Sequence, residues 1–284
     1  STNLDGVNKS ITALESMGYE VVVGKSCYEE YGYLSGIDRI RSSDINNMFS
    51  DSSIDGIFCI RGGYGTIRIL DMIGFCSPAF HRDAYVGYSD ITTLHVAFNQ
   101  MCDLVTYHGP MPSTDMIKDF KEFSKKSLLV NIMDEDTTMN ILNPKDNNIQ
   151  TYKGGKTEGI LIGGNLSLLV STIGTPYEVE TEGKILFIED IDEEPYSIDR
   201  MLSQLRLSGK LHNARVTVTG SIYNPLPKKK SKSLSLENAI NDVLSNINIP
   251  MIKGVKAGHC EPMITLAFGR KIILDADNCW IKYK

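Results

Sequence analysis

The chain has 284 residues, of which 42% are apolar and 23% charged, a balance typical of folded globular proteins that excludes a disordered chain, a coiled coil or a collagen-like repeat. A formal net charge of −6 argues against binding to a nucleic-acid backbone, and no apolar run is long enough to span a membrane. The length exceeds one ordinary hydrophobic core and predicts one large or two modest domains.

Helix and strand patterns alternate through the first part of the chain. The predicted elements are a helix over 8–17, a strand over 19–23, a helix over 36–48, a strand over 57–60, a helix over 67–73, a strand over 84–87 and a helix over 91–101. This alternation predicts βαβ units and a mostly parallel sheet. Ligands of such sheets bind at the carboxyl ends of the strands.

The pattern of apolar and charged residues changes after residue 115. Residues 116–156 mix charged and apolar side chains without a clear period, whereas short apolar runs follow at 184–188, 215–219, 263–268 and 271–274, with helices expected over 197–207 and 236–247. We predict an α/β fold with an N-terminal parallel-sheet α/β domain over 1–115, a connecting segment over 116–156 and a β-rich C-terminal domain over 157–284. The basic run 228–232 is interpreted as a solvated loop rather than a nucleic-acid site.

The six cysteines and five histidines form no recognisable disulfide or metal-binding pattern. No cysteine pair is spaced C-x-x-C and no histidine pair is spaced H-x-x-x-H. Residues 1–5 have neither the basic start nor the apolar stretch of a secretory signal. We therefore expect reduced cysteines, no metal or other cofactor, and a cytoplasmic location.

Ser89 is the sharpest candidate for chemistry. It follows a short predicted strand and a glycine and precedes a helix, as a nucleophile elbow requires, because that tight turn lifts the hydroxyl out of the sheet. The familiar elbow has a second glycine two places on, where this chain has Ile91. The alternative is that Ser89 only caps the helix.

The glycine-rich turn 61–66 is a second candidate. Its glycines follow a buried strand and let backbone amides face a ligand, as an oxyanion hole needs. A dinucleotide fingerprint would need a further glycine where Arg68 stands, so we do not expect a nucleotide cofactor. A plain tight turn is the alternative.

A serine nucleophile needs a base, and spacing alone does not choose between two histidines. His259 lies in a loop rich in glycine and proline before a strand, and His108 lies before Gly109 and Pro110. His95 falls within the helix after Ser89 and is expected to point away from the elbow. Either candidate could instead be a structural histidine.

The third member of a triad would be a carboxylate that orients the imidazole. Glu189 and Asp190 end an apolar strand and face opposite sides of it, so only one can reach a given histidine. The order Ser89, Glu189, His259 matches that of many hydrolases. An acidic, solvated strand end is the alternative.

Several short motifs follow one another from residue 60 to residue 262. They are I-R-G-G-Y-G (60–65), V-G-Y-S-D-I-T (86–92), H-G-P-M (108–111), L-I-G-G-N-L-S-L-L (161–169), G-T-P-Y (174–177), L-F-I-E-D (186–190), E-P-Y-S-I-D-R-M-L (194–202) and A-G-H-C-E-P (257–262). Together they resemble the LD-carboxypeptidase family of serine peptidases, the murein tetrapeptide carboxypeptidases. The resemblance covers most of the chain.

The resemblance implies a serine carboxypeptidase that releases the terminal D-alanine from an L,D-peptide bond of peptidoglycan tetrapeptides in cell-wall recycling. It implies Ser89 as nucleophile, Glu189 as acid and His259 as base. The oxyanion hole would comprise the backbone amides of Asp90 and of Gly62 or Gly63. It also implies a homodimer. The mechanism needs no cofactor, and the composition already argues against a nucleic-acid or membrane partner.

Two further residues are weak candidates for binding the terminal carboxylate of the substrate. These are Arg61 and Arg82, and a surface or structural role is the alternative for each. The chain departs from the family pattern at its front, where the first strand of the sheet is missing from the sequence pattern. This departure does not involve the triad.

Two other functions remain open. The microcin C self-immunity peptidases share the triad, although the loop E-E-P-Y-S-I-D-R-M-L (193–202) is more similar to that of the cell-wall group. A non-catalytic protein that binds muropeptides on the same fold is the alternative from a different class.

Overall fold

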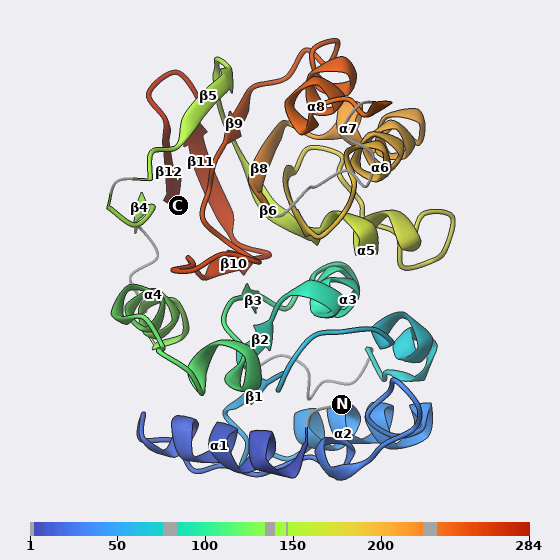
Figure 1. The fold of residues 1–284 in the computed structure, drawn as a ribbon, viewed down its shortest axis with the longest axis vertical. Coiled ribbons are helices and arrows are strands. Elements are labelled where there is room, and N and C mark those ends of the chain that lie inside the picture. The colour runs from blue at the N-terminus through green and yellow to red at the C-terminus, as the bar shows by residue number, and fades with distance from the viewer. Residues whose placement is uncertain (1–2, 76–83, 134–139, 146, 224–231) are drawn as a thin grey trace.

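The computed structural model describes residues 3–75, 84–133, 140–145, 147–223 and 232–284, which form two β-sheets flanked by helices (Figure 1). The smaller sheet has the strand order β1-β2-β3-β10. Its strands are β1 (Gly56–Phe58), β2 (Ala84–Gly87), β3 (Thr106–His108) and β10 (Leu266–Phe268). The first three are parallel, and β10 pairs antiparallel with β3.

The larger sheet has the order β4-β12-β11-β6-β7-β8-β9-β5. Its strands are β4 (Asn140–Ile141), β5 (Gln150–Lys153), β6 (Lys156–Asn165), β7 (Ile185–Ile191), β8 (Val216–Tyr223), β9 (Met251–Lys253), β11 (Lys271–Asp275) and β12 (Trp280–Tyr283). Strands β6 to β9 are parallel and the remaining pairs are antiparallel. The mixed α/β fold class predicted from the sequence is confirmed, and the domain boundaries stay a prediction.

The helices cover both sheets (Figure 1). They are α1 (Leu4–Glu15), α2 (Asp38–Ser50), α3 (Thr92–Cys102), α4 (Glu122–Met133), α5 (Leu166–Ser171), α6 (Pro195–Leu207), α7 (Lys210–Asn213) and α8 (Leu236–Leu244). Residues Thr66–Met72, predicted as a helix, form a 3₁₀-helix. Within the described residues, no helix is both long and apolar enough to cross a membrane.

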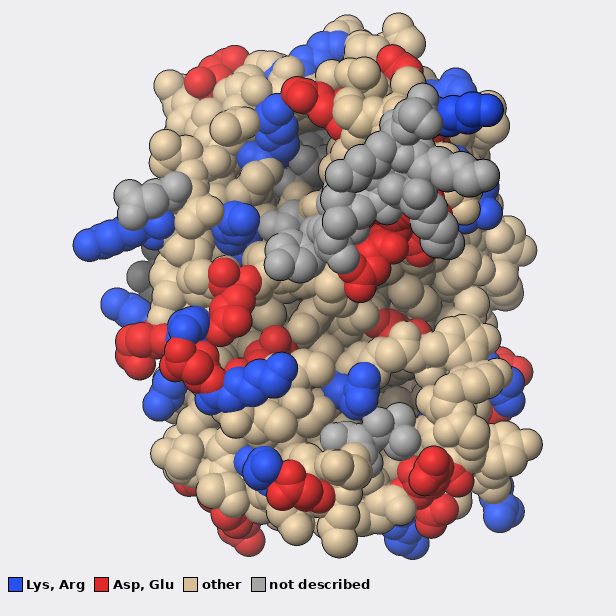
Figure 2. Space-filling view, in the orientation of Figure 1, with Lys and Arg blue, Asp and Glu red and all other residues tan. Residues whose placement is uncertain are grey.

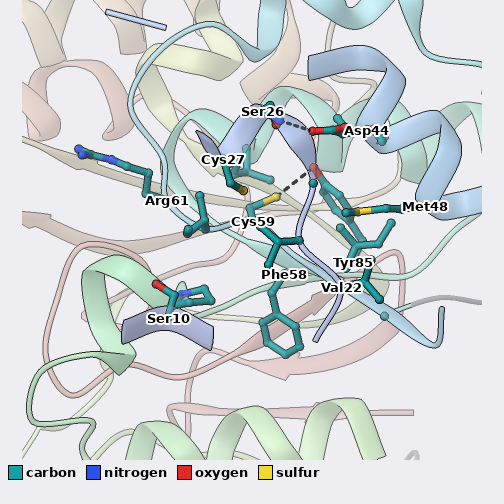
Figure 3. Close-up of a pocket in the computed structure, with 18 of the residues that line it drawn as sticks. Ser10, Val22, Ser26, Cys27, Asp44, Met48, Phe58, Cys59, Arg61 and Tyr85 are labelled. Atoms are coloured by element: carbon teal, nitrogen blue, oxygen red, sulfur yellow. Dashed lines mark hydrogen bonds between the residues drawn. The ribbon is translucent and has the colours of Figure 1, made fainter. Parts of the chain in front are cut away.

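The strand predicted over 19–23 does not form. These residues and β1 line the same cavity of about 990 Å³, in which Val22 and Phe58 are seen together (Figure 3). A β-strand needs a neighbour for its backbone hydrogen bonds, and 19–23 pairs with no strand in the described part of the chain. That the sheet lacks a first strand stays a prediction.

The predicted connecting segment contains helix α4 and the short strands β4 and β5. The buried residues of α4 are Ser124, Leu128 and Asn131, at helical spacing, so two of the three inward positions are polar. Ser124 and Ser127 accept hydrogen bonds from backbone amides of the stretch just after the loop of His259. A search for apolar periodicity overlooks such a helix because its inner face is partly polar.

Strand β10 brings the second half of the chain into the smaller sheet, where Figure 1 shows it beside β3. Its Phe268 is fully buried and packs 5.2 Å from the ring of His108 and 6.1 Å from the ring of Phe187 on β7. This aromatic contact joins the two sheets, since His108 lies at the end of β3 in the smaller sheet and Phe187 lies on β7 in the larger one.

Candidate active site

Ser89 stands at the carboxyl end of β2, in a backbone conformation that side chains seldom adopt. Its φ is +65°, and residues Ser89–Ile91 form one 3₁₀ turn before α3. Gly87 allows this tight path, since a Cβ there would lie 3.0 Å from Ile91 and 3.1 Å from Cys59. Such strain is typical of a nucleophile elbow.

Glu189, His259 and Ser89 lie in one hydrogen-bonded row, although they are remote from one another in the sequence. His259 Nδ1 lies 2.7 Å from Glu189 Oε2, and His259 Nε2 lies 3.2 Å from Ser89 Oγ. Glu189 Oε2 also accepts the backbone N–H of His259 at 3.2 Å. The carboxylate therefore fixes both the loop and the ring of His259.

Strand β7 aims two adjacent carboxylates at different partners. Glu189 is fully buried at a register shift between β7 and β8 and faces His259. Asp190 accepts hydrogen bonds from Asn165 Nδ2 and from the amide and hydroxyl of Ser167, at the start of α5. The expectation that only one of the two acids can reach a given histidine agrees with this geometry.

The pKa of His259 lies above its ordinary value. Burial alone lowers this pKa, but the hydrogen bond and charge of Glu189 raise it, and the charges of Asp190 and Asp115 add to the effect. Glu189 thus stabilises the protonated imidazolium. A histidine of this kind can take a proton from a hydroxyl and hold it.

The glycine-rich turn packs directly against Ser89. A Cβ on Gly62 would lie 2.9 Å from Ser89 Cβ and 3.1 Å from Ser89 Oγ, so only glycine fits there. Gly63 has φ +130° with open space around it, which exposes the backbone. The Asp90 carboxylate accepts the Thr66 N–H at 3.0 Å and ties the turn to the elbow.

The competing histidines lie in the core behind the site. His108 and His95 are both fully buried, and within the described residues neither ring nitrogen of His108 has a hydrogen-bond partner. Burial lowers the pKa of His95 to about 4 and the pKa of His108 well below its ordinary value. His95 Nε2 lies 2.8 Å from the Gly87 carbonyl. Both rings are held neutral, and neither hydrogen-bonds Ser89.

The structure describes only one of the two arginines considered for the substrate carboxylate. Arg61 is exposed, and its guanidinium extends away from Phe58 and Cys59 (Figure 3). Arg82, Cys76 and the run 228–231 lie outside the described residues. On the face shown in Figure 2, basic and acidic side chains alternate rather than gather in one field.

Two residues beside the row of Ser89, His259 and Glu189, namely Tyr88 and Asp115, are not singled out by sequence patterns. Tyr88 lies between the glycine and the serine of the G-Y-S-D motif, and its ring stacks edge-on against His259 with 5.0 Å between centroids. Its hydroxyl donates to Asp115 Oδ1 at 3.2 Å. The only signals in the sequence are that Tyr88 directly precedes Ser89 and that Asp115 follows the motif H-G-P-M by four residues.

Family models match both halves of the chain. Residues 1–109 match the LD-carboxypeptidase N-terminal domain, and residues 158–274 match the LD-carboxypeptidase C-terminal domain. The chain belongs to the LD-carboxypeptidase family. The resemblance seen in its motifs is confirmed, and with it the assignment as a hydrolase of this serine peptidase family.

Named relatives of this LD-carboxypeptidase agree with that family. The probable murein peptide carboxypeptidase of Bacillus subtilis is 43% identical over 271 residues, covering 95% of this chain and 84% of the relative. The crystal structure of muramoyltetrapeptide carboxypeptidase from Oxalobacter formigenes has a TM-score of 0.87 at 26% identity, covering 99% of this chain and 95% of that one. The microcin C7 self-immunity protein MccF of Escherichia coli is 28% identical over 95% of this chain and 85% of its own length.

Proposed function

We propose that this LD-carboxypeptidase releases the terminal D-alanine from an L,D-peptide bond of murein tetrapeptides by serine catalysis. The observation that carries the proposal is the continuous row Ser89–His259–Glu189 in a member of this family. The names of the Bacillus and Oxalobacter relatives support a murein peptide as substrate. A homodimer and a cytoplasmic location stay predictions.

In the proposed mechanism each member of the row has its own role. With its proton on Nδ1 donated to Glu189, the His259 ring accepts the Ser89 hydroxyl proton at Nε2 while Ser89 Oγ attacks the substrate carbonyl. The imidazolium then donates that proton to the departing amine of D-alanine. Water repeats the sequence on the acyl-enzyme and releases the shortened peptide.

Backbone amides around Ser89 supply the oxyanion hole in this proposal. The candidates are the amide of Asp90, directly after Ser89, and the amide of Gly62 or Gly63 in the glycine-rich turn. Gly62 packs against the Ser89 side chain, and a Cβ on Gly63 would meet no atom within 4 Å, which supports access of a substrate to this turn. One such donor typically contributes about 10² to 10³ in turnover.

The nucleophile can be tested by one substitution. Ser89→Ala is expected to lower D-alanine release from a murein tetrapeptide by at least about 10³-fold, because neither the base nor the acid can replace the missing oxygen. The loss of one alanine mass is followed by mass spectrometry. Ser50→Ala, at an exposed serine at the end of α2, is the control and is expected to keep full activity. Undiminished release by Ser89→Ala would disprove the triad.

A microcin-type amidase is the second candidate, favoured by the similarity to MccF. Turnover of the murein tetrapeptide and of an aminoacyl-sulfamoyl nucleoside, measured side by side, separates the two, and we expect the peptide to be preferred. The non-catalytic alternative predicts tight binding of the tetrapeptide by calorimetry with no product from the intact protein.

A further inference from the structure

Asp115 is fixed in a rigid turn that follows β3. It belongs to the π-helical turn Pro112–Met116, and its Oδ2 accepts the backbone N–H of Met111 at 2.8 Å and the hydroxyl of Thr114 at 2.9 Å. Its other oxygen, Oδ1, accepts the hydroxyl of Tyr88 at 3.2 Å. Three donors from two elements therefore hold this carboxylate in one orientation.

Tyr88 transmits that orientation to the triad. It is only 6% exposed and stands directly before Ser89. Its ring meets the His259 ring edge-on, at 5.0 Å between centroids and 73° between planes, and lies 6.0 Å from the ring of His108. Because its hydroxyl is anchored to Asp115, the Tyr88 ring forms a fixed wall beside the imidazole.

The charged and titratable groups around His259 come from three elements. Glu189 and Asp190 lie on β7, His108 on β3 is held neutral by burial, and Asp115 lies in the turn after β3. The charge of Asp115 is one of the causes that raise the pKa of His259. Burial raises the pKa of Tyr88 far above its ordinary value, so Tyr88 remains a neutral donor.

We propose that Asp115 is a positioning residue for His259, acting through the anchored ring of Tyr88 and through its own negative charge. The anchored ring of Tyr88 orients the imidazole, and the charge of Asp115 favours the imidazolium that forms when Ser89 is deprotonated. This inference rests on the proposed role of His259 as base.

The test compares two neighbouring aspartates. Asp115→Asn keeps the shape but removes the charge and one of the two accepting oxygens, both of which receive hydrogen bonds. Asp119→Asn removes the same charge from an 81% exposed side chain of the same segment. For Asp115→Asn we expect kcat to fall about tenfold, the worth of one ordinary hydrogen bond, with KM within about twofold. We also expect the acid limb of kcat/KM to move to lower pH. Asp119→Asn is expected to match the parent enzyme in kcat, in KM and in the position of the acid limb.

Tyr88→Phe separates orientation from charge. It keeps the ring and the Asp115 charge but removes the hydrogen bond, so kcat is expected to fall while the acid limb stays in place. If Asp115→Asn has the kcat and acid limb of Asp119→Asn, or if only its thermal stability falls, the inference is wrong. Should Asp115→Asn not fold, an unchanged kcat in Tyr88→Phe overturns it. The proposed triad is tested separately, by Ser89→Ala.

Discussion

Gly258 stands directly before His259, and its α-carbon faces the carboxylate of Glu189. A Cβ at this position would lie 2.5 Å from Glu189 Oε2 and 2.6 Å from Glu189 Cδ, and φ is +84°. Glycine is therefore required twice, once for the backbone conformation and once for space. The close approach is what lets Glu189 bind both the amide and the ring of His259.

Gly258→Ala is expected to lower kcat/KM by at least about 10²-fold, because the carboxylate or the histidine loop must move by more than the hydrogen bond tolerates. Gly174→Ala is the matched control, since Gly174 has φ +86° but open space around it. The control variant has the same backbone strain but no steric clash of the new Cβ with a neighbouring side chain. Equal activity in the two variants would show that the contact with Glu189 is unimportant.

The pH dependence of activity follows from the raised pKa of His259. His259, the proposed base, must be neutral to accept a proton, so kcat/KM is expected to fall as the pH drops through a value above 6.5, the ordinary value for histidine. Glu189→Gln removes the charge that raises this pKa. We expect its acid limb at lower pH and its kcat lower by about 10² to 10⁴. An acid limb that does not move would mean that other groups set it.

At the scale of elements, helix α4 secures the chain after the His259 loop. Ser124 Oγ accepts the Met263 N–H and Ser127 Oγ accepts the Thr265 N–H, each at 2.9 Å. These amides are not part of a strand pairing, so the two serines take the place of a neighbouring strand.

Ser124→Ala is expected to lower the free energy of unfolding by about 1–3 kcal/mol, because the buried amide of Met263 loses its acceptor. Urea denaturation measures the change, with Ser50→Ala as the control expected to stay within about 0.5 kcal/mol. A loss no larger than that of the control would mean that water replaces the serine hydroxyl.

The elements that sequence patterns predict well are those with an apolar inner face, such as β2, α3 and α6. Helix α4 escapes a search for apolar periodicity because Ser124 and Asn131 face inward. Residues 19–23 have the pattern of a strand, but the pattern cannot show whether a neighbouring strand exists. The choice between His108 and His259 stayed open on spacing alone. The choice depends on the burial of His108 against Phe187 and Phe268, which lie far along the chain. Within the sequence, only the family resemblance favours His259.

At the scale of the whole molecule, Phe268 connects groups from both sheets. Its ring lies 5.2 Å from His108 on β3, 5.8 Å from His95 on α3 and 6.1 Å from Phe187 on β7. Since both sheets pack on this ring, we expect them to unfold together.

Phe268→Ala is expected to lower the free energy of unfolding by about 3–5 kcal/mol, as for other large buried rings. Fluorescence of Trp280, the single tryptophan, reports on the larger sheet, and circular dichroism reports on the whole chain. The two probes are expected to give one coincident transition at a lower midpoint. Separate transitions would show that the sheets unfold independently.

Because β10 from the second half of the chain belongs to the smaller sheet, it limits how homologues can be recombined. A hybrid made by joining the front of one homologue to the back of another would pair β3 of one parent with β10 of the other, immediately beside β2, the strand that leads to Ser89. Recombination between the two halves is thus constrained at the β3–β10 pair. Hybrid proteins are expected to fold when both strands of this pair come from one parent.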